Sequence, residues 1–176
     1  MNGFRNMEIK VLGPYRLLAF ALVSGVSFSH YLHAATVTAT ATAVVLTPIS
    51  LTKNADLSFG DVYPDISSLG TVSIDSGSNR SAGGAAALGP AVGTAAQFTV
   101  TGEASAAYVI SLPSTSVTLT SASSDTMTVD NFINDGTGTL NGGGTEIVSV
   151  GATLHVGAGQ APGSYSGTFD VTVNYN

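Results

Sequence analysis

The sequence predicts an all-β fold, built as an antiparallel β-sandwich, and three observations predict it. Apolar and polar residues alternate with a period of two in short runs, which is typical of strands with one buried face. These runs recur about every 8–12 residues, with Gly-, Pro- and Asn-containing turns between them. Outside the N-terminal leader, no stretch of useful length has the i, i+3, i+4 spacing of an amphipathic helix.

Residues 1–34 are expected to be a signal peptide. An apolar run of thirteen residues, Leu17 to Ser29, follows a basic start and precedes the small residues Ala34 and Ala35. A membrane-spanning helix needs about 20 apolar residues, so this run favours a cleaved leader over the alternative of an N-terminal anchor. No membrane span is expected after cleavage. The cations of the basic start are Arg5, Lys10 and Arg16.

The rest of the chain is predicted to contain an N-terminal extension strand at residues 35–47 and one β-sandwich domain at residues 48–176. From Thr36 to Val45, Thr alternates with Val or Ala, and Pro48 ends the pattern. We predict that this segment is an assembly strand that pairs with a sheet edge of its own domain or of a neighbouring subunit. Its apolar face consists of Val37, Ala39, Ala41, Ala43 and Val45.

Within the domain, runs of alternating residues predict the further strands in order. The interval 80–88 is the weakest of them, because Ser, Gly and Ala dominate it. Strands are expected at 49–52, 57–60, 71–74, 80–88, 97–101, 108–112, 116–120, 127–132, 147–150 and 153–156.

The C-terminal run from Ser164 to Asn176 alternates without a break and predicts one long closing strand. We expect Phe169, Val171 and Val173 to be core residues. The C-terminal alternating strand, with the glycine that precedes it, comprises Gly163, Tyr165, Gly167, Phe169, Val171, Val173 and Tyr175.

Composition excludes several functions. After cleavage about 141 residues remain, with two cations, Lys53 and Arg80, and ten carboxylates, so the net charge is 2 − 10 = −8 with His155 neutral. Nucleic-acid binding needs clustered Lys and Arg, so no nucleic-acid partner is expected. The chain has no cysteine, and packing and backbone ladders must hold the fold without disulfides.

The residues for catalysis are also scarce. His155 is the only histidine after the leader, and no G-x-S-x-G or similar motif accompanies it. A zinc site needs three or four His, Cys or carboxylate ligands, and the soft ligands are missing. We therefore expect no catalytic residues, no cofactor and no metal, and we expect that the protein is not an enzyme.

Four segments carry a resemblance to a known family. They are Leu46 to Gly60, Phe98 to Glu103, Val150 to Leu154 and Pro162 to Tyr175. Together they resemble the bacterial family called domain of unknown function 4402, over nearly all of the chain after the leader. The family attaches no activity to the fold.

The layout also resembles, more distantly, the subunits of chaperone–usher pili and the spore-coat-U-like proteins. In those proteins a signal peptide and an alternating N-terminal segment precede an incomplete immunoglobulin-like domain. Their last strand has an aromatic penultimate residue and a glycine fourteen places from the end, which Tyr175 and Gly163 match here. This chain departs from them in having no disulfide and in presenting mostly Ala on its extension.

The resemblance implies an immunoglobulin-like sandwich that is completed by N-terminal strand donation. We therefore expect an extracellular structural subunit of a fimbrial or surface-coat type assembly, secreted by a bacterium to its periplasm and cell surface. Its partners would be further copies of the chain, other surface subunits or a periplasmic chaperone. The alternative is a monomeric secreted adhesin or carbohydrate-binding β-sandwich module, whose ligand would contact loops such as 76–93.

Overall fold

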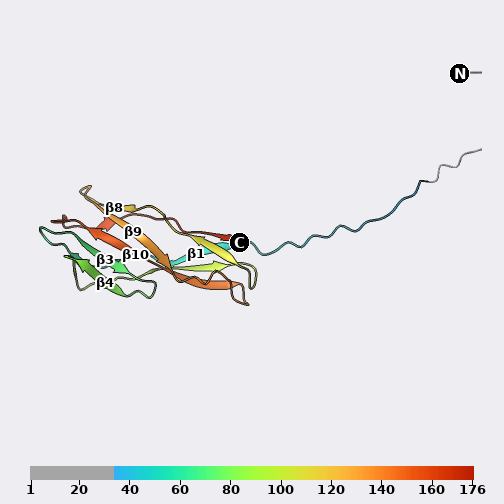
Figure 1. Cartoon of the computed structure of the whole chain (residues 1–176), viewed down its shortest axis with the longest axis horizontal. Helices are drawn as coiled ribbons and strands as arrows, with labels where there is room; N and C mark the ends of the chain where they lie inside the picture. The colour runs from blue at the N-terminus through green and yellow to red at the C-terminus, as the bar shows by residue number, and fades with distance from the viewer. Residues whose placement is uncertain (1–33) are drawn as a thin grey trace, which may run out of the picture. The chain divides into compact units, whose positions relative to one another are not determined.

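The computed structural model describes residues 34–176, so the predicted signal peptide lies outside the described residues apart from Ala34 (Figure 1). Residues 1–42 and 43–176 form two separate units. In the described part of the first unit, residues 34–42 are exposed and form no strand. No helix within residues 34–176 has the length and apolar character to cross a membrane.

The second unit is all-β, and every strand pair in it is antiparallel. Every regular element of the described chain is therefore a strand, as the sequence predicts. The strands are β1 (Ser50–Ala55), β2 (Val62–Tyr63), β3 (Gly70–Ile74), β4 (Arg80–Gly84), β5 (Ala87–Leu88), β6 (Ala96–Thr101), β7 (Tyr108–Ser111), β8 (Val117–Ser121), β9 (Thr126–Asn134), β10 (Thr145–Val156), β11 (Tyr165–Ser166) and β12 (Thr172–Tyr175).

An eight-stranded sheet forms the larger layer. Its strands follow the order β1-β6-β10-β9-β8-β11, and β3, with β4 beside it, pairs with the end of β10. Figure 1 shows β8, β9, β10, β3 and β4 side by side along this sheet. Two smaller sheets, β12-β7 and β2-β5, have two strands each.

The β12-β7 sheet packs on the larger sheet, which makes the arrangement sandwich-like. One core cluster joins Val100 and Val148 of the larger sheet to Tyr108 of β7, and Val173 of β12 packs against it. Leu140, from the connection between β9 and β10, completes this cluster. Side chains of both layers thus exclude water from a shared interior.

Strand β10 supplies the longest buried row. Val148, Val150, Ala152, Leu154 and Val156 are all buried, and they alternate with half-buried residues except at Gly151, which is buried as well. The sequence predicted two strands here, at 147–150 and 153–156, but the structure has one. The backbone of Ile74 approaches position 151 so closely that a Cβ there would collide with it. Because glycine has no Cβ, the strand can continue through Gly151.

Three other differences concern short elements. The predicted strand at 57–60 is wrong, because this interval makes only one isolated bridge, between Ser58 and Thr94. The predicted strand at 80–88 is two strands, β4 and β5. The two-residue strand β2 was not predicted, because a pair of residues is too short to show a period of two.

Tyr108 and Glu146 form a polar pair at the end of the core. The Tyr108 hydroxyl donates to Glu146 Oε2 at 2.6 Å, and the Thr137 amide donates to Glu146 Oε1 at 2.7 Å. Partial burial acts to raise the pKa of Glu146, but these hydrogen bonds favour the ionised form and hold the pKa below its ordinary value. Burial, followed by the Glu146 contact, raises the pKa of Tyr108 well above its ordinary value.

We predict that Ile74→Ala lowers the free energy of unfolding by about 2–5 kcal/mol, because it leaves a cavity in the core. Ile74 is 1% exposed in the cluster beneath β3 and β10. The matched control is Ile147→Ala, whose side chain is 61% exposed and should lose about 1 kcal/mol or less. Chemical denaturation measures both, and similar losses for the two variants would contradict the assigned core.

We predict that Glu146 makes the fold sensitive to acid. Its pKa is lowered in the folded state, so its stabilising effect is complete above the ordinary value of 4.5 and is lost as the pH falls through the folded-state pKa. Denaturation between pH 6 and pH 3 should show a smaller loss of stability in Glu146→Gln than in the unmodified chain. Equal slopes for the two proteins would contradict the prediction.

Candidate functional site

The C-terminal stretch 165–175 does not form the single long strand that the sequence predicts. Its first part, β11, pairs with β8, and its last part, β12, pairs with β7. Residues 167–171 between them belong to no strand and make no backbone-to-backbone hydrogen bond. The partner chain explains the break, because β7 ends at Ser111, Pro113 follows, and β8 begins only at Val117.

The alternation of this stretch is retained in part. Its apolar side chains face inward and pack against the core. They are only half-buried, whereas the sequence predicted Phe169, Val171 and Val173 as core residues. Phe169 contacts the ring of Phe132 with 5.0 Å between the ring centroids. The half-buried side chains are Tyr165, Phe169, Val171 and Val173, whereas Gly163, Gly167 and Tyr175 are exposed.

Strand β12 has a free edge. Within residues 34–176 it pairs with β7 alone, although β1 of the larger sheet lies close to it. A strand paired on one side presents unpaired N–H and C=O groups on the other, which another extended chain can satisfy. Together with the unpaired residues 167–171, β12 offers the backbone surface of an acceptor strand.

A cavity of about 800 Å3, here called the inter-sheet groove, borders the first half of the same stretch. One wall is the segment 57–64, and the other is the segment 160–169. Its base consists of side chains from β8, β9 and β10: Val117, Leu119, Met127, Val129, Phe132, Leu154 and Val156.

The polar groups that line the groove are largely satisfied by the protein itself. The Tyr165 hydroxyl donates to the Ala161 carbonyl at 2.7 Å, and the Gln160 amide donates to Tyr165 at 2.9 Å and to the Thr126 carbonyl at 3.2 Å. No side-chain polar atom buried within the described residues lacks a partner. The groove therefore presents apolar side chains together with polar groups that largely have partners within the protein.

Arg80 holds the first wall of the inter-sheet groove in place. Its guanidinium donates to the backbone carbonyls of Phe59, Asp61, Gly89 and Ala91, at 2.9, 3.2 and 2.7 Å for the first three. A planar guanidinium with five donors can satisfy several carbonyls at once, which a lysine cannot. The sequence identified Arg80 only as a cation, because these carbonyls come from loops distant in the chain.

The wall depends on a glycine at the same point. Gly60 has a φ of +68°, and a Cβ there would collide with the Ala91 carbonyl and the Arg80 guanidinium. The wall thus combines a left-handed backbone turn with a half-buried cation.

The predicted assembly segment, residues 36–45, has no strand in the structure. Its side chains are exposed, with Val37 at 94% and Val45 at 95%. Its assembly role stays a prediction.

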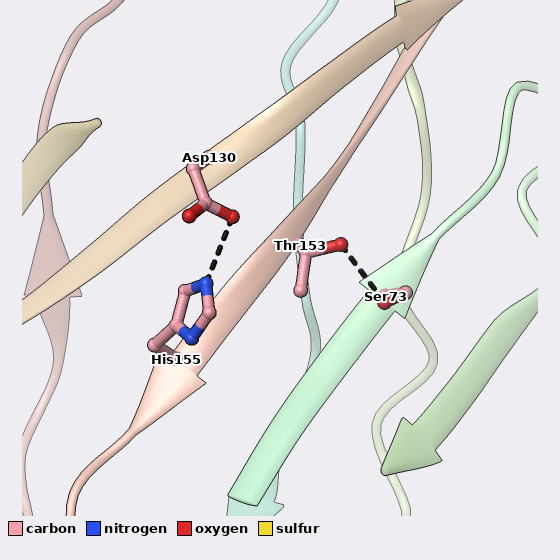
Figure 2. A network of polar contacts seen from close by, with 4 residues as sticks. All are labelled: Ser73, Asp130, Thr153 and His155. Atoms are coloured by element: carbon pink, nitrogen blue, oxygen red, sulfur yellow. Dashed lines mark hydrogen bonds and ion pairs between the residues drawn. The ribbon is translucent and has the colours of Figure 1, made fainter. Parts of the chain in front are cut away.

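His155 is half-buried on β10 between the buried Leu154 and Val156, so it lies on the face of the larger sheet opposite to theirs. Figure 2 shows its ring beside Asp130 of β9. Its Nε2 atom lies 2.8 Å from Asp130 Oδ1, a pairing that the sequence did not predict because it depends on the β9–β10 register. Nearby, the Ser73 and Thr153 hydroxyls form a separate hydrogen bond of 3.0 Å. No hydrogen bond joins the ring to either hydroxyl, and a Ser–His–Asp arrangement needs one.

These features define an antiparallel β-sandwich domain with a free strand edge at β12 and a groove bordered by residues 160–169. A family model, the domain of unknown function DUF4402, matches residues 49–175, and the chain belongs to this family. No curated protein and no solved structure matches the chain.

We predict that Arg80→Met lowers the free energy of unfolding by about 1.5–3 kcal/mol, because four backbone carbonyls lose a charged hydrogen-bond donor. The control is Lys53→Met, which removes an exposed ion pair to Asp56 and should change stability by about 1 kcal/mol or less. Denaturation gives the stabilities, and proteolysis should cut the segment 57–64 faster in Arg80→Met alone. Equal behaviour of the two variants would contradict this role of Arg80.

Proposed function

We propose that this protein is an extracellular structural subunit of a fimbrial or surface-coat type assembly, and that its subunits are joined by strand pairing and not by catalysis. The observation that carries the proposal is the one-sided pairing of β12, at the end of the C-terminal stretch whose first half borders the inter-sheet groove. An added strand would pair its backbone with the free edge and place alternate side chains over the groove.

The extension has the composition of such a strand. Residues 36–46 carry no charge, contain no Gly or Pro, and alternate Thr with Val or Ala over most of their length. Thr and Val have high strand propensity, so the segment is suited to pairing once an edge is offered. The predicted signal peptide agrees with a surface location, because it would export the chain.

The proposal also fits the absence of cysteine. A subunit exported from the cell often gains stability from disulfides, and this chain has none. A strand from another subunit would cover the apolar side chains at the base of the groove and satisfy the free edge, and both effects stabilise the folded domain.

We predict that Ala41→Pro prevents concentration-dependent oligomers of the exported protein, because proline removes a ladder donor from the middle of the segment. The matched control is Ala41→Val, which raises strand propensity and should preserve or strengthen assembly. Light scattering after size-exclusion chromatography, over a range of concentrations, measures the oligomers.

Two results would count against strand pairing. One is an unmodified protein that stays monomeric at every concentration, as a monomeric adhesin would. The other is an equal degree of assembly in the proline and valine variants.

A further inference from the structure

A second cavity, of about 320 Å3 and here called the outer pocket, lies where β9 and β3 adjoin the end of β10. Its lining includes Thr71, Thr128 and His155. His155 pairs directly with Thr128 on one side and with Thr71 on the other. Residues that are paired across neighbouring strands share one face of a sheet, so these three form a row. The row lies on the face opposite to the buried Leu154 and Val156.

Hydrogen bonds hold the walls of the outer pocket in place. The Asp65 carboxylate accepts the Ser67 amide at 2.9 Å, and the Asp65 carbonyl accepts the Gly159 amide at 2.8 Å. The loop before β3 is thereby joined to the turn after β10. Gln160, next in that turn, donates to the Thr126 carbonyl of β9 at 3.2 Å. The pocket is therefore preformed, as most small-molecule sites are.

The row of three residues offers hydrogen-bonding groups to a ligand. His155 Nε2 lies 2.8 Å from Asp130 Oδ1 (Figure 2), and a carboxylate only accepts, so Nε2 carries the hydrogen. In the neutral ring the other nitrogen, Nδ1, is then an acceptor. Among residues 34–176, no hydrogen bond engages the Thr71 or Thr128 hydroxyl. Each hydroxyl can both donate and accept, which suits a partner that has hydroxyls of its own.

Charge and apolar surface narrow the class of ligand. Among the residues that the structure describes, no lysine or arginine lines the outer pocket, and Asp130 lies beside His155. An anion would therefore gain no attraction there. The side chain of Leu69, 74% exposed, adds an apolar wall. A neutral sugar ring matches both features, because it carries hydroxyls at its rim and C–H groups on its faces.

We infer that the outer pocket binds a neutral sugar ring. His155 and Thr128 bind hydroxyls of the sugar, and Leu69 packs against its C–H surface. No Phe, Tyr or Trp of the described chain lines the pocket, so the affinity for a single ring is modest, with a dissociation constant on the order of 1 mM. This inference goes beyond the proposed function and does not depend on it.

Nuclear magnetic resonance of the exported protein, labelled with 15N, tests the inference. The probes are the methyl glycosides of glucose, galactose and mannose, each added stepwise. At least one of them should shift the amide signals of residues 69–71, 126–128 and 155–157 in a saturable way. Glucuronate, which has the ring of glucose and a carboxylate, should bind more weakly than methyl glucoside.

Two variants of one row provide a matched comparison. Thr128→Val removes a hydroxyl but keeps the shape of the side chain, and it should raise the dissociation constant about fivefold, the effect of about one lost hydrogen bond. The control is Thr118→Val. Thr118 of β8 is exposed and pairs directly with Thr128, but it does not line the outer pocket. The control should bind as the unmodified protein does.

Several outcomes would overturn the inference. They are the absence of saturable shifts at the outer pocket with all three glycosides, equal dissociation constants for Thr128→Val and Thr118→Val, and stronger binding of glucuronate. An oligosaccharide that ends in the bound sugar identifies the source of the ring. Retained binding assigns the terminal residue of a glycan, lost binding assigns a free sugar, and both uphold the inference. Strand pairing stands or falls separately, by the oligomers of the Ala41 variants.

Discussion

Strand β10 hydrogen-bonds with three other strands, and its buried row contributes to all three core clusters. Its first half pairs with β6, its second half with β3, and its other edge with β9. Val148, Val150 and Leu154 each belong to a different cluster. The chain has no disulfide to join its parts, so β10 is the element that aligns β6 and β1 on one side with β3 and β4 on the other. Its close contact at Gly151 allows it to stay continuous where its partner changes from β6 to β3.

The two layers of the sandwich are unequal, and the inter-sheet groove follows from this difference. The larger sheet has eight strands, whereas the layer that covers it has only β7 and β12. The cover is good over the cluster around Val100 and Tyr108, where side chains of both layers meet. On the N-terminal side of Phe169, the short strand β11 pairs with β8 and so belongs to the larger sheet. No strand of the smaller layer covers β8, β9 and β10 at that end, and their side chains form the base of the cavity.

Periodicity predicted the elements that alternate for four residues or more, because a buried face imposes a period of two. The rows of β6 and β10 are clear examples. In β6, Thr99 is half-buried between the buried Phe98 and Val100, and in β10 Val148 and Val150 are buried on either side of Ser149. Contacts between distant segments left no local pattern. The carbonyls around Arg80, the pairing of His155 with Asp130 and the break at residues 167–171 all depend on long-range register. The composition of the extension predicted strand propensity, but the hydrogen bonds that hold the backbone of Thr47 come from Glu103 and Tyr175, which lie 56 and 128 residues away.

The energetics of strand exchange place the selectivity in a few side chains. A ladder hydrogen bond contributes about 1 kcal/mol net, whereas ordering one residue of a free segment costs about 1–2 kcal/mol. The backbone ladder by itself therefore does not favour association of residues 36–46 with β12. The surplus must come from apolar side chains that leave water, at about 1.5–3 kcal/mol for a fully buried valine or leucine. Ala39, Ala41 and Ala43 bury little area, so Val37 and Val45 at the two ends of the apolar row contribute most of it. A strand of this kind would bind with specificity only where both ends of its apolar row meet the acceptor in one register.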